Sequence, residues 1–174
     1  CPNTATSWLY GGPTTIVNIA PNLYVADINI NNLPYLVSIT GLDNFGNVSW
    51  GRPQAATTLE PTPVYFRRLS IEGCPLLTTI PDFYWALDLQ AIVLINTGIS
   101  TLDAKFSQLS HVYELHFLHN EFLITFGNGF ENAINVKSLL IDTALNLESL
   151  GTAFMNPDHI VFLTDPVTIK SCPK

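Results

Sequence analysis

Histidine is the side chain best suited here to acid–base or metal chemistry, and the sequence holds four: His111, His116, His119 and His159. Two of them form an H-x-x-H pair. In zinc proteases the paired histidines lie one turn apart on a helix, where both face one metal ion. His116 and His119 fall instead in an expected strand and turn, where such a pair points to opposite sides. We therefore expect structural or solvated histidines and no metal site.

Other catalytic patterns are missing from the sequence. No G-x-S-x-G segment presents a serine nucleophile, and no glycine-rich loop matches a phosphate or dinucleotide site. The carboxylates are scattered along the chain. Asp27 and Asp142 are expected at opposite ends of the fold, too far apart to act as an acid/base pair. The sequence therefore predicts a protein that is not an enzyme and that uses no cofactor.

A repeat of apolar residues predicts the elements that hold these side chains. The pattern apolar-x-x-apolar-x-apolar starts at Val25, Phe66, Leu89, Val112 and Val136, and the last four starts are 23, 23 and 24 residues apart. Each occurrence alternates as a strand does and is followed by turn residues. Such a repeat indicates a solenoid in which every unit adds one strand to a parallel sheet.

The second half of each unit repeats as well. A small or turn residue follows each strand, namely Leu33, Cys74, Thr97, Asn120 and Ala144. Side chains of Asn, Cys and Thr at this place can bond the backbone inside the turn. Aromatic residues recur later on the returning arm, at Tyr84, Phe106, Phe130 and Phe154. We expect these rings to stack into a column that closes the convex side of the core.

Residues 25–42 and 66–165 resemble an extracellular leucine-rich repeat domain, since the LTTIP segment from Leu77 to Pro81 is close to that superfamily's L-x-x-I-P. The resemblance implies an α/β solenoid of about six units of 23–24 residues. A parallel β-sheet would form the concave face, with irregular, short helical or 3-10 returns on the convex face. Only Asn120 supplies the ladder asparagine, and the plant-type G-x-I-P element is missing, so no receptor subclass follows.

A chain of 174 residues has the length of one domain. We expect an N-terminal cap, the repeats, one insertion loop within them, and a C-terminal tail or cap, at residues 1–24, 25–165, 44–63 and 166–174. The insertion loop is rich in glycine and proline, which indicates an exposed loop. It contains the sequon Asn47-Val48-Ser49, so Asn47 is a predicted N-glycosylation site.

The three cysteines have different expected roles. Cys74 falls at an inward turn position, where a buried thiol behaves as a small apolar group. Cys1 and Cys172 fall at opposite ends of the solenoid, roughly 25 Å apart for strands stacked at ~4.8 Å, whereas a disulfide needs Cα atoms about 4.4–6.8 Å apart. Each is either a cap cysteine with a partner outside this sequence or part of an intermolecular bond. In the second case, Cys172 of one subunit links to Cys1 of the next.

Composition and the resemblance together indicate an extracellular or cell-surface protein. Apolar residues make up 47% of the chain and charged residues only 12%, half of the usual share. Seven basic residues stand against fourteen acidic ones with no basic cluster, which excludes nucleic acid and an anionic membrane surface as partners. No apolar run approaches the length needed to span a bilayer, so we expect no membrane insertion by this segment.

Outward positions of the expected strands form columns across the concave face. Early units place polar residues there, whereas later units place apolar ones. We name as the sheet patch the residues expected to contact a partner: Val93, Ile95, His116, Leu118 and Leu140. Glu72, Glu114 and Asp142 rim this patch. An apolar patch with a polar rim is typical of a binding surface; the alternative is that a loop or the C-terminal tail covers it.

Two functions of different class follow from the sequence. The first is a non-catalytic extracellular interaction module that binds a protein or glycan partner through the concave face. The second is a structural subunit that self-assembles head-to-tail into a filament, sheath or cell-surface appendage, with Cys1 and Cys172 available for intersubunit disulfides. Expected partners are therefore another protein, an identical subunit or a glycan.

Overall fold

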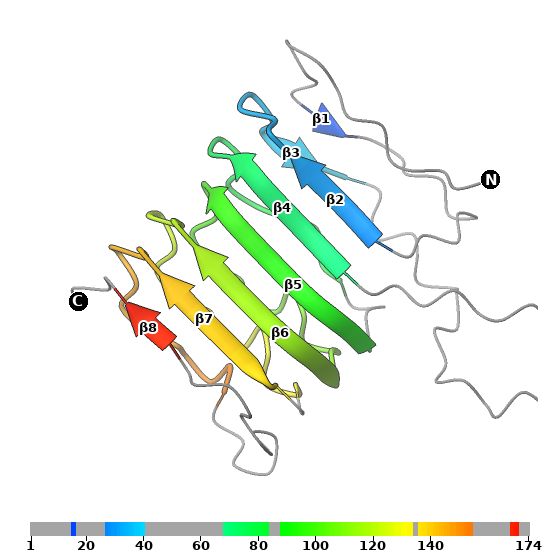
Figure 1. The fold of residues 1–174 in the computed structure, drawn as a ribbon, viewed down its shortest axis with the longest axis vertical. Helices are drawn as coiled ribbons and strands as arrows, with labels where there is room; N and C mark the ends of the chain where they lie inside the picture. The colour runs from blue at the N-terminus through cyan, green and yellow to red at the C-terminus, as the bar shows by residue number, and fades with distance from the viewer. Residues whose placement is uncertain are drawn as a thin grey trace, which may run out of the picture.

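The computed structural model describes residues 15–16, 27–40, 68–83, 88–133, 136–154 and 168–170. Over this part of the chain the protein is a solenoid of parallel strands joined by irregular returns, without a helix (Figure 1). The strands are β1 (Thr15–Ile16), β2 (Asp27–Asn31), β3 (Ser38–Ile39), β4 (Arg68–Cys74), β5 (Asp88–Thr97), β6 (His111–Leu118), β7 (Ser138–Asp142) and β8 (Thr168–Lys170). The predicted solenoid with a parallel sheet is confirmed.

The main sheet has the strand order β2-β4-β5-β6-β7-β8, and every neighbouring pair is parallel. Successive coils therefore stack in chain order, as Figure 1 shows. A second, shorter ladder runs along the returning arm, where β1 pairs with β3 and single bridges join Thr101 to Thr125 and Thr125 to Ser149. The coils that follow β5, β6 and β7 are thus bonded to one another both through the main sheet and through the returning arm.

Alternation along the strands produces the core. In β7, Leu139 and Ile141 are buried while Ser138, Leu140 and Asp142 face outward and are half-buried. This period of two is the geometry of an extended strand with one packed face. The inward apolar positions of the sequence repeat are therefore the ones that fill the interior of the solenoid.

At the end of each main-sheet strand from β2 to β7, the residue directly before or directly after the last strand residue lies in the left-handed region. The φ angles are 56° at Asn32, 67° at Gly73, 51° at Asn96, 54° at His119 and 56° at Thr143. Glycine reaches this region freely, and asparagine and histidine adopt it more readily than most residues. The bend turns the chain off the sheet and directs the next side chain inward. This column of left-handed residues was not predicted from the sequence.

The residue directly after each left-handed residue is a buried turn residue. The hydrogen bonds to the backbone that were predicted for these turn residues are present. Asn120 is 2% exposed. Its Oδ1 accepts hydrogen bonds from Thr97 N at 3.0 Å and Thr97 Oγ1 at 2.8 Å, and its Nδ2 donates to Leu94 O at 2.8 Å. Cys74 is fully buried, and its thiol donates to Glu72 O at 3.6 Å. These bonds satisfy polar groups that the turn would otherwise bury unpaired.

An aromatic column lines the returning arm, as predicted, with one correction. Its rings belong to Phe83, Phe106, Phe130 and Phe154, with centroid separations of 5.1, 5.2 and 5.8 Å and interplanar angles of 6°, 10° and 8°. The prediction of Tyr84 as the first ring was wrong. Phe83 follows Ile80 by three positions, whereas Phe106 follows Leu102 by four. The prediction assumed four positions in every coil and therefore reached Tyr84 in place of Phe83. Tyr84 itself lies outside the described residues.

The end of the sheet extends into the predicted C-terminal tail or cap. β8 pairs with β7 through Leu140–Thr168, Ile141–Ile169 and Asp142–Lys170. Its three residues thus add a strand at the edge of the sheet and do not lie across the sheet patch. No helix among the described residues is long and apolar enough to cross a membrane.

Candidate interaction surface

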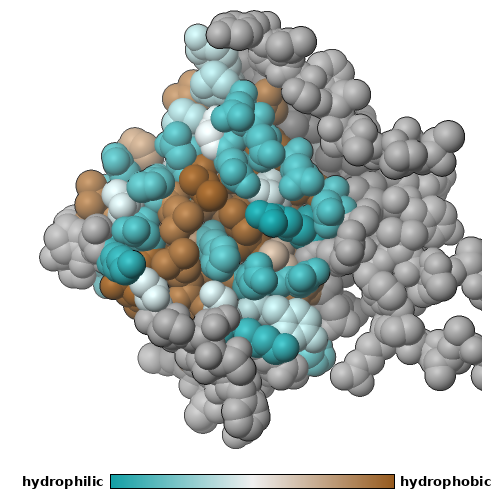
Figure 2. Space-filling view, viewed as in Figure 1, coloured by the Kyte–Doolittle hydropathy of each residue, from teal (hydrophilic) through white to brown (hydrophobic). Residues whose placement is uncertain are grey.

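The outward columns predicted across the sheet are aligned in the structure. Strand register places Val93 beside His116 and His116 beside Leu140, while Ile95 lies beside Leu118. Five residues from three consecutive strands, β5 to β7, therefore meet on one face. Figure 2 shows an apolar area in the middle of this face, bordered by hydrophilic side chains.

Burial differs within the sheet patch. Val93 is only 3% exposed, whereas Ile95, His116, Leu118 and Leu140 are half-buried. Val93 therefore forms the floor of the patch, and the other four residues offer the surface that a partner can touch. Close neighbours on adjacent strands, about 4.8 Å away, explain why an outward side chain at the centre is so well covered.

Two carboxylates flank the apolar pair Ile95 and Leu118 in the same outward column of the sheet. Glu72 is the register neighbour of Ile95, and Asp142 is the register neighbour of Leu118. Ser70 Oγ donates a hydrogen bond to the Glu72 carboxylate, and Thr143 Oγ1 bonds to Asp142 Oδ1 at 3.1 Å. These bonds orient the two carboxylates. An acidic group thus stands at each end of the Ile95–Leu118 pair.

The histidines offer no metal site in the described part of the chain. His116 Nε2 lies 3.3 Å from Ser138 Oγ on the neighbouring strand, while His119 occupies the left-handed turn and is exposed. Across the ranges that the structure describes, no group of three or more His, Cys, Asp or Glu side chains could hold a metal ion. His116 is placed to exchange hydrogen bonds at the patch.

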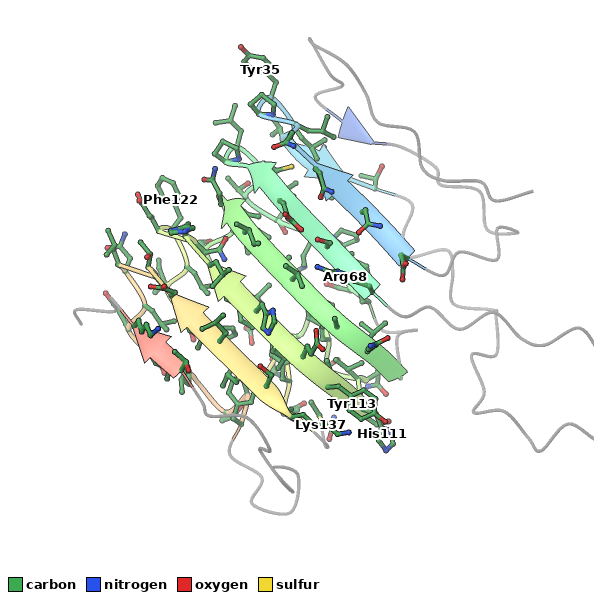
Figure 3. All side chains as sticks on the ribbon, viewed as in Figure 1. Tyr35, Arg68, His111, Tyr113, Phe122 and Lys137 are labelled. Carbon is green, nitrogen blue, oxygen red and sulfur yellow. The ribbon has the colours of Figure 1, made fainter. Side chains whose placement is uncertain are left out.

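Tyr113 and Lys137 form a rim feature that the sequence analysis missed. Tyr113 is 39% exposed, and Lys137 Nζ lies 4.6 Å from the centroid of its ring, a cation–π arrangement. Lys137 N also donates to Tyr113 O at 2.9 Å. Figure 3 shows both residues at the beginning of strands β6 and β7. The sequence did contain a sign of this feature. Two residues, Tyr113 and Glu114, separate the inward Val112 from the inward Leu115, so strict alternation fails at Tyr113.

A second surface lies on the flank where the chain leaves the ends of the strands. There a hollow of about 440 Å³ is lined by Gly98, Ser100, Phe122 and Ile124, together with three polar side chains, Thr78, Asn146 and Glu148. Phe122 and Ile124 project beside it with 58% and 44% of their surface exposed. This flank surface was not predicted from the sequence.

A shortened turn explains the hollow. One residue, Gly98, separates Thr97 from the inward Ile99, whereas two residues separate Asn120 from Leu123 in the next coil. The β5 coil therefore lacks the exposed side chain that Phe122 supplies in the β6 coil. Glycine is required there, because a Cβ atom on Gly98 would lie 2.4 Å from the backbone oxygen of Pro75. The missing residue was visible in the sequence as a repeat that is one residue short.

Three of the predicted site residues lie outside the described residues, namely Cys1, Cys172 and Asn47, as does the insertion loop 44–63. The predicted disulfide linkage and glycosylation therefore stay predictions. Cys74 is the free cysteine of the described part, and it is buried.

Comparison with known proteins gives no relative for this chain: no family model, no curated protein and no solved structure matches it significantly. The solenoid is established by its own strand pairing. The leucine-rich repeat assignment stays a resemblance in sequence pattern.

Proposed function

We propose that this protein is a non-catalytic extracellular interaction module that binds a protein partner through the sheet patch. One observation carries the proposal: Ile95 and Leu118 are register neighbours on the outer face of the sheet, and half-buried Leu140 lies beside His116 on the same face. Apolar groups gathered on a surface are stabilised by a partner that removes them from water. The face of a solenoid sheet is also the usual binding surface of repeat proteins.

The chemistry of the patch favours a protein over a glycan. A sugar site relies on aromatic platforms and dense hydrogen bonding, whereas the centre of this patch is aliphatic and Tyr113 stands at its margin. Glu72, at one end of the apolar pair, selects a complementary charge, whereas Asp142 at the other end has Lys170 as its register neighbour on β8. The expected partner therefore presents an apolar side chain with a basic residue on the Glu72 side.

The extracellular location is part of the same proposal. It is supported by the low share of charged residues and by the sequon at Asn47, which is functional only in a secreted chain. The alternative, a head-to-tail structural subunit linked through Cys1 and Cys172, differs in a measurable way because its assemblies collapse when disulfides are reduced.

Substitution of Leu118 tests the proposal. Leu118→Asp places a charge beside Asp142 in the centre of the patch and should weaken partner binding by at least ~30-fold. Leu76→Asp is the matched control, because Leu76 is 50% exposed on the flank of the solenoid and should leave binding unchanged. Wild type and both variants are immobilised, exposed to the extracellular fraction of the source, and compared by quantitative mass spectrometry of the bound proteins.

Melting temperatures complete the test. Leu118 is half-buried on the outer face, so Leu118→Asp should melt close to the wild type. A large fall in melting temperature would show that Leu118 is a core residue. Equal capture by all three proteins would show that the sheet patch is not the binding surface.

A further inference from the structure

The flank hollow is a trough that crosses four successive coils and is separate from the sheet patch. Its floor is formed by the residue that directly follows the buried apolar residue of each turn. From the β4 coil to the β7 coil these residues are Thr78, Ser100, Ile124 and Glu148. Hydrogen bonds from Ile124 N to Ser100 O and from Glu148 N to Ile124 O, both 2.9 Å long, join neighbouring coils along the floor. The trough therefore has a rigid floor that runs along the stack of coils.

One wall of the trough combines an aromatic ring with an amide. Phe122 and Asn146 occupy the same turn position in the β6 and β7 coils, two residues after Asn120 and Ala144, and both line the hollow. Phe122 leaves more than half of its surface in water. Asn146 Nδ2 donates to Glu121 O at 2.7 Å, which fixes the orientation of the amide. The wall thus offers an apolar ring beside a hydrogen-bonding group that is held in place.

We propose that this trough binds an extended, unbranched and neutral glycan chain. A sugar ring has an apolar face of C–H groups that stacks on an aromatic ring, and hydroxyl groups at its edge that exchange hydrogen bonds. The hollow supplies both kinds of contact. Phe122 serves the face, and three polar side chains serve the edge, namely Thr78, Ser100 and Asn146. The volume of about 440 Å³ lies within the ~300–1,000 Å³ that is usual for ligand sites.

The spacing of the coils suits a chain of sugar rings. Neighbouring coils lie about 4.8 Å apart, close to the length of one pyranose unit in an extended oligosaccharide. Each successive sugar unit would thus meet a new floor side chain. Gly98 leaves the wall open in the β5 coil, because its turn is one residue short. A sugar ring can therefore reach Ser100 on the floor while it stacks on Phe122.

The hydrogen bonds along the floor favour a glycan over a peptide. A peptide that adds to a fold as an extra strand pairs with open main-chain groups. In this trough the amides of Ile124 and Glu148 already donate to the neighbouring coil, as stated above. Recognition therefore depends on side-chain hydroxyl and amide groups, which suit a ligand rich in hydroxyl groups.

Charge favours a neutral glycan over an acidic one. Among the described residues that line the hollow there is no Lys, Arg or His, whereas Glu148 contributes a carboxylate. That carboxylate repels sulfate and uronate groups. The net charge of -7 on the whole chain acts in the same direction.

Isothermal titration calorimetry of the full chain tests the proposal, with cellohexaose and chitohexaose as neutral probes and heparin as the acidic probe. The wild type should bind a neutral probe, and Phe122→Ala should weaken that binding by at least ~10-fold because the stacking surface is lost. Ser100→Phe should abolish it, because a phenyl ring on the floor would fill the trough. Phe122→Tyr keeps the ring and should bind as the wild type does.

Tyr35→Ala is the matched control. Tyr35 is 60% exposed and lies on the same side of the molecule as Phe122 (Figure 3), but it is not among the residues that line the hollow. Its loss should leave sugar binding unchanged. Circular dichroism melts check that every variant is folded.

Each outcome supports or overturns the proposal. A neutral probe whose binding is weakened by Phe122→Ala and Ser100→Phe, but kept by Phe122→Tyr and Tyr35→Ala, supports the trough as a glycan site. A wild type that binds neither neutral probe, or binds heparin alone, overturns it. Binding that both trough variants retain, or that only Leu118→Asp abolishes, also overturns it and locates the sugar elsewhere on the molecule.

Discussion

At the residue scale, Asn120 shows how one buried polar side chain joins neighbouring coils. It accepts two hydrogen bonds from Thr97 and donates one to Leu94 O, while being almost fully removed from water. Buried hydrogen bonds contribute modestly when made and cost more when one partner is deleted. The side chain of Asn120 therefore matters mainly because of the backbone groups that would be left unpaired without it.

Asn120→Ala should lower the free energy of unfolding by about 3 kcal/mol, because Thr97 N and Leu94 O lose their partner in a buried turn. Thr97→Val is the control. It removes only the hydroxyl bond and should cost about 1 kcal/mol. Urea unfolding of both variants measures the difference. Equal losses would mean that the backbone bonds of Asn120 do not stabilise the turn.

Cys74 makes the stability of the fold depend on pH in the alkaline range. Burial raises the pKa of the Cys74 thiol above 9.0, the value of an unperturbed cysteine, and a backbone hydrogen bond from Leu33 opposes part of that rise. The unfolded chain ionises first as the pH increases. The stability linked to the neutral thiol is therefore complete below pH 9.0 and is lost as the pH rises toward the folded pKa.

The wild type should thus lose more stability than Cys74→Ala between about pH 8 and pH 10 in urea unfolding. A thiol reagent provides a second measurement, since buried Cys74 should react only after unfolding. Parallel pH profiles of the two proteins would contradict this assignment.

At the element scale, the aromatic column fixes the returning arm against the sheet. Phe106 is fully buried and stacks on Phe83 and Phe130 with nearly parallel rings. Offset or edge-on contacts between rings add to the burial of their surface. Deleting a middle ring removes both effects and leaves a cavity between two coils.

Phe106→Ala should therefore lower the free energy of unfolding by about 4 kcal/mol, measured by denaturant titration. Phe106→Leu keeps most of the volume and should lose roughly 1.5 kcal/mol. A small effect of the alanine variant would mean that the column closes up without the ring. It would also show that ring stacking is not what holds the return.

The sequence predicted the elements whose residues must face inward. In β4 to β7 the repeated apolar residues follow the strand period, because each of them fills the core. Once the inward residues are known, the residues between them must point outward, so the outward columns were predictable too. The first aromatic ring was misplaced by one residue, since a return tolerates length changes that a paired strand does not. The column of left-handed residues could not be predicted from the sequence. Asn32, Gly73 and Thr143 have similar φ angles but side chains of different chemistry, so no residue type repeats at this position.

At the scale of the whole molecule, coils contact only their neighbours, so surfaces arise from columns rather than from a pocket. The sheet patch was predictable because alternation alone decides which side chains point outward. The depth of Val93 was not, since it depends on the side chains of adjacent strands. The flank hollow likewise requires comparing turn lengths between coils that contact each other in space.

We propose that the chain acts through non-covalent contacts of its outer surfaces. The most direct test is the mass of the native protein from its source, measured with and without reductant. We predict that reductant does not change this mass. A series of multiples of the single-chain mass that collapses on reduction would contradict the proposal and indicate a subunit linked through Cys1 and Cys172.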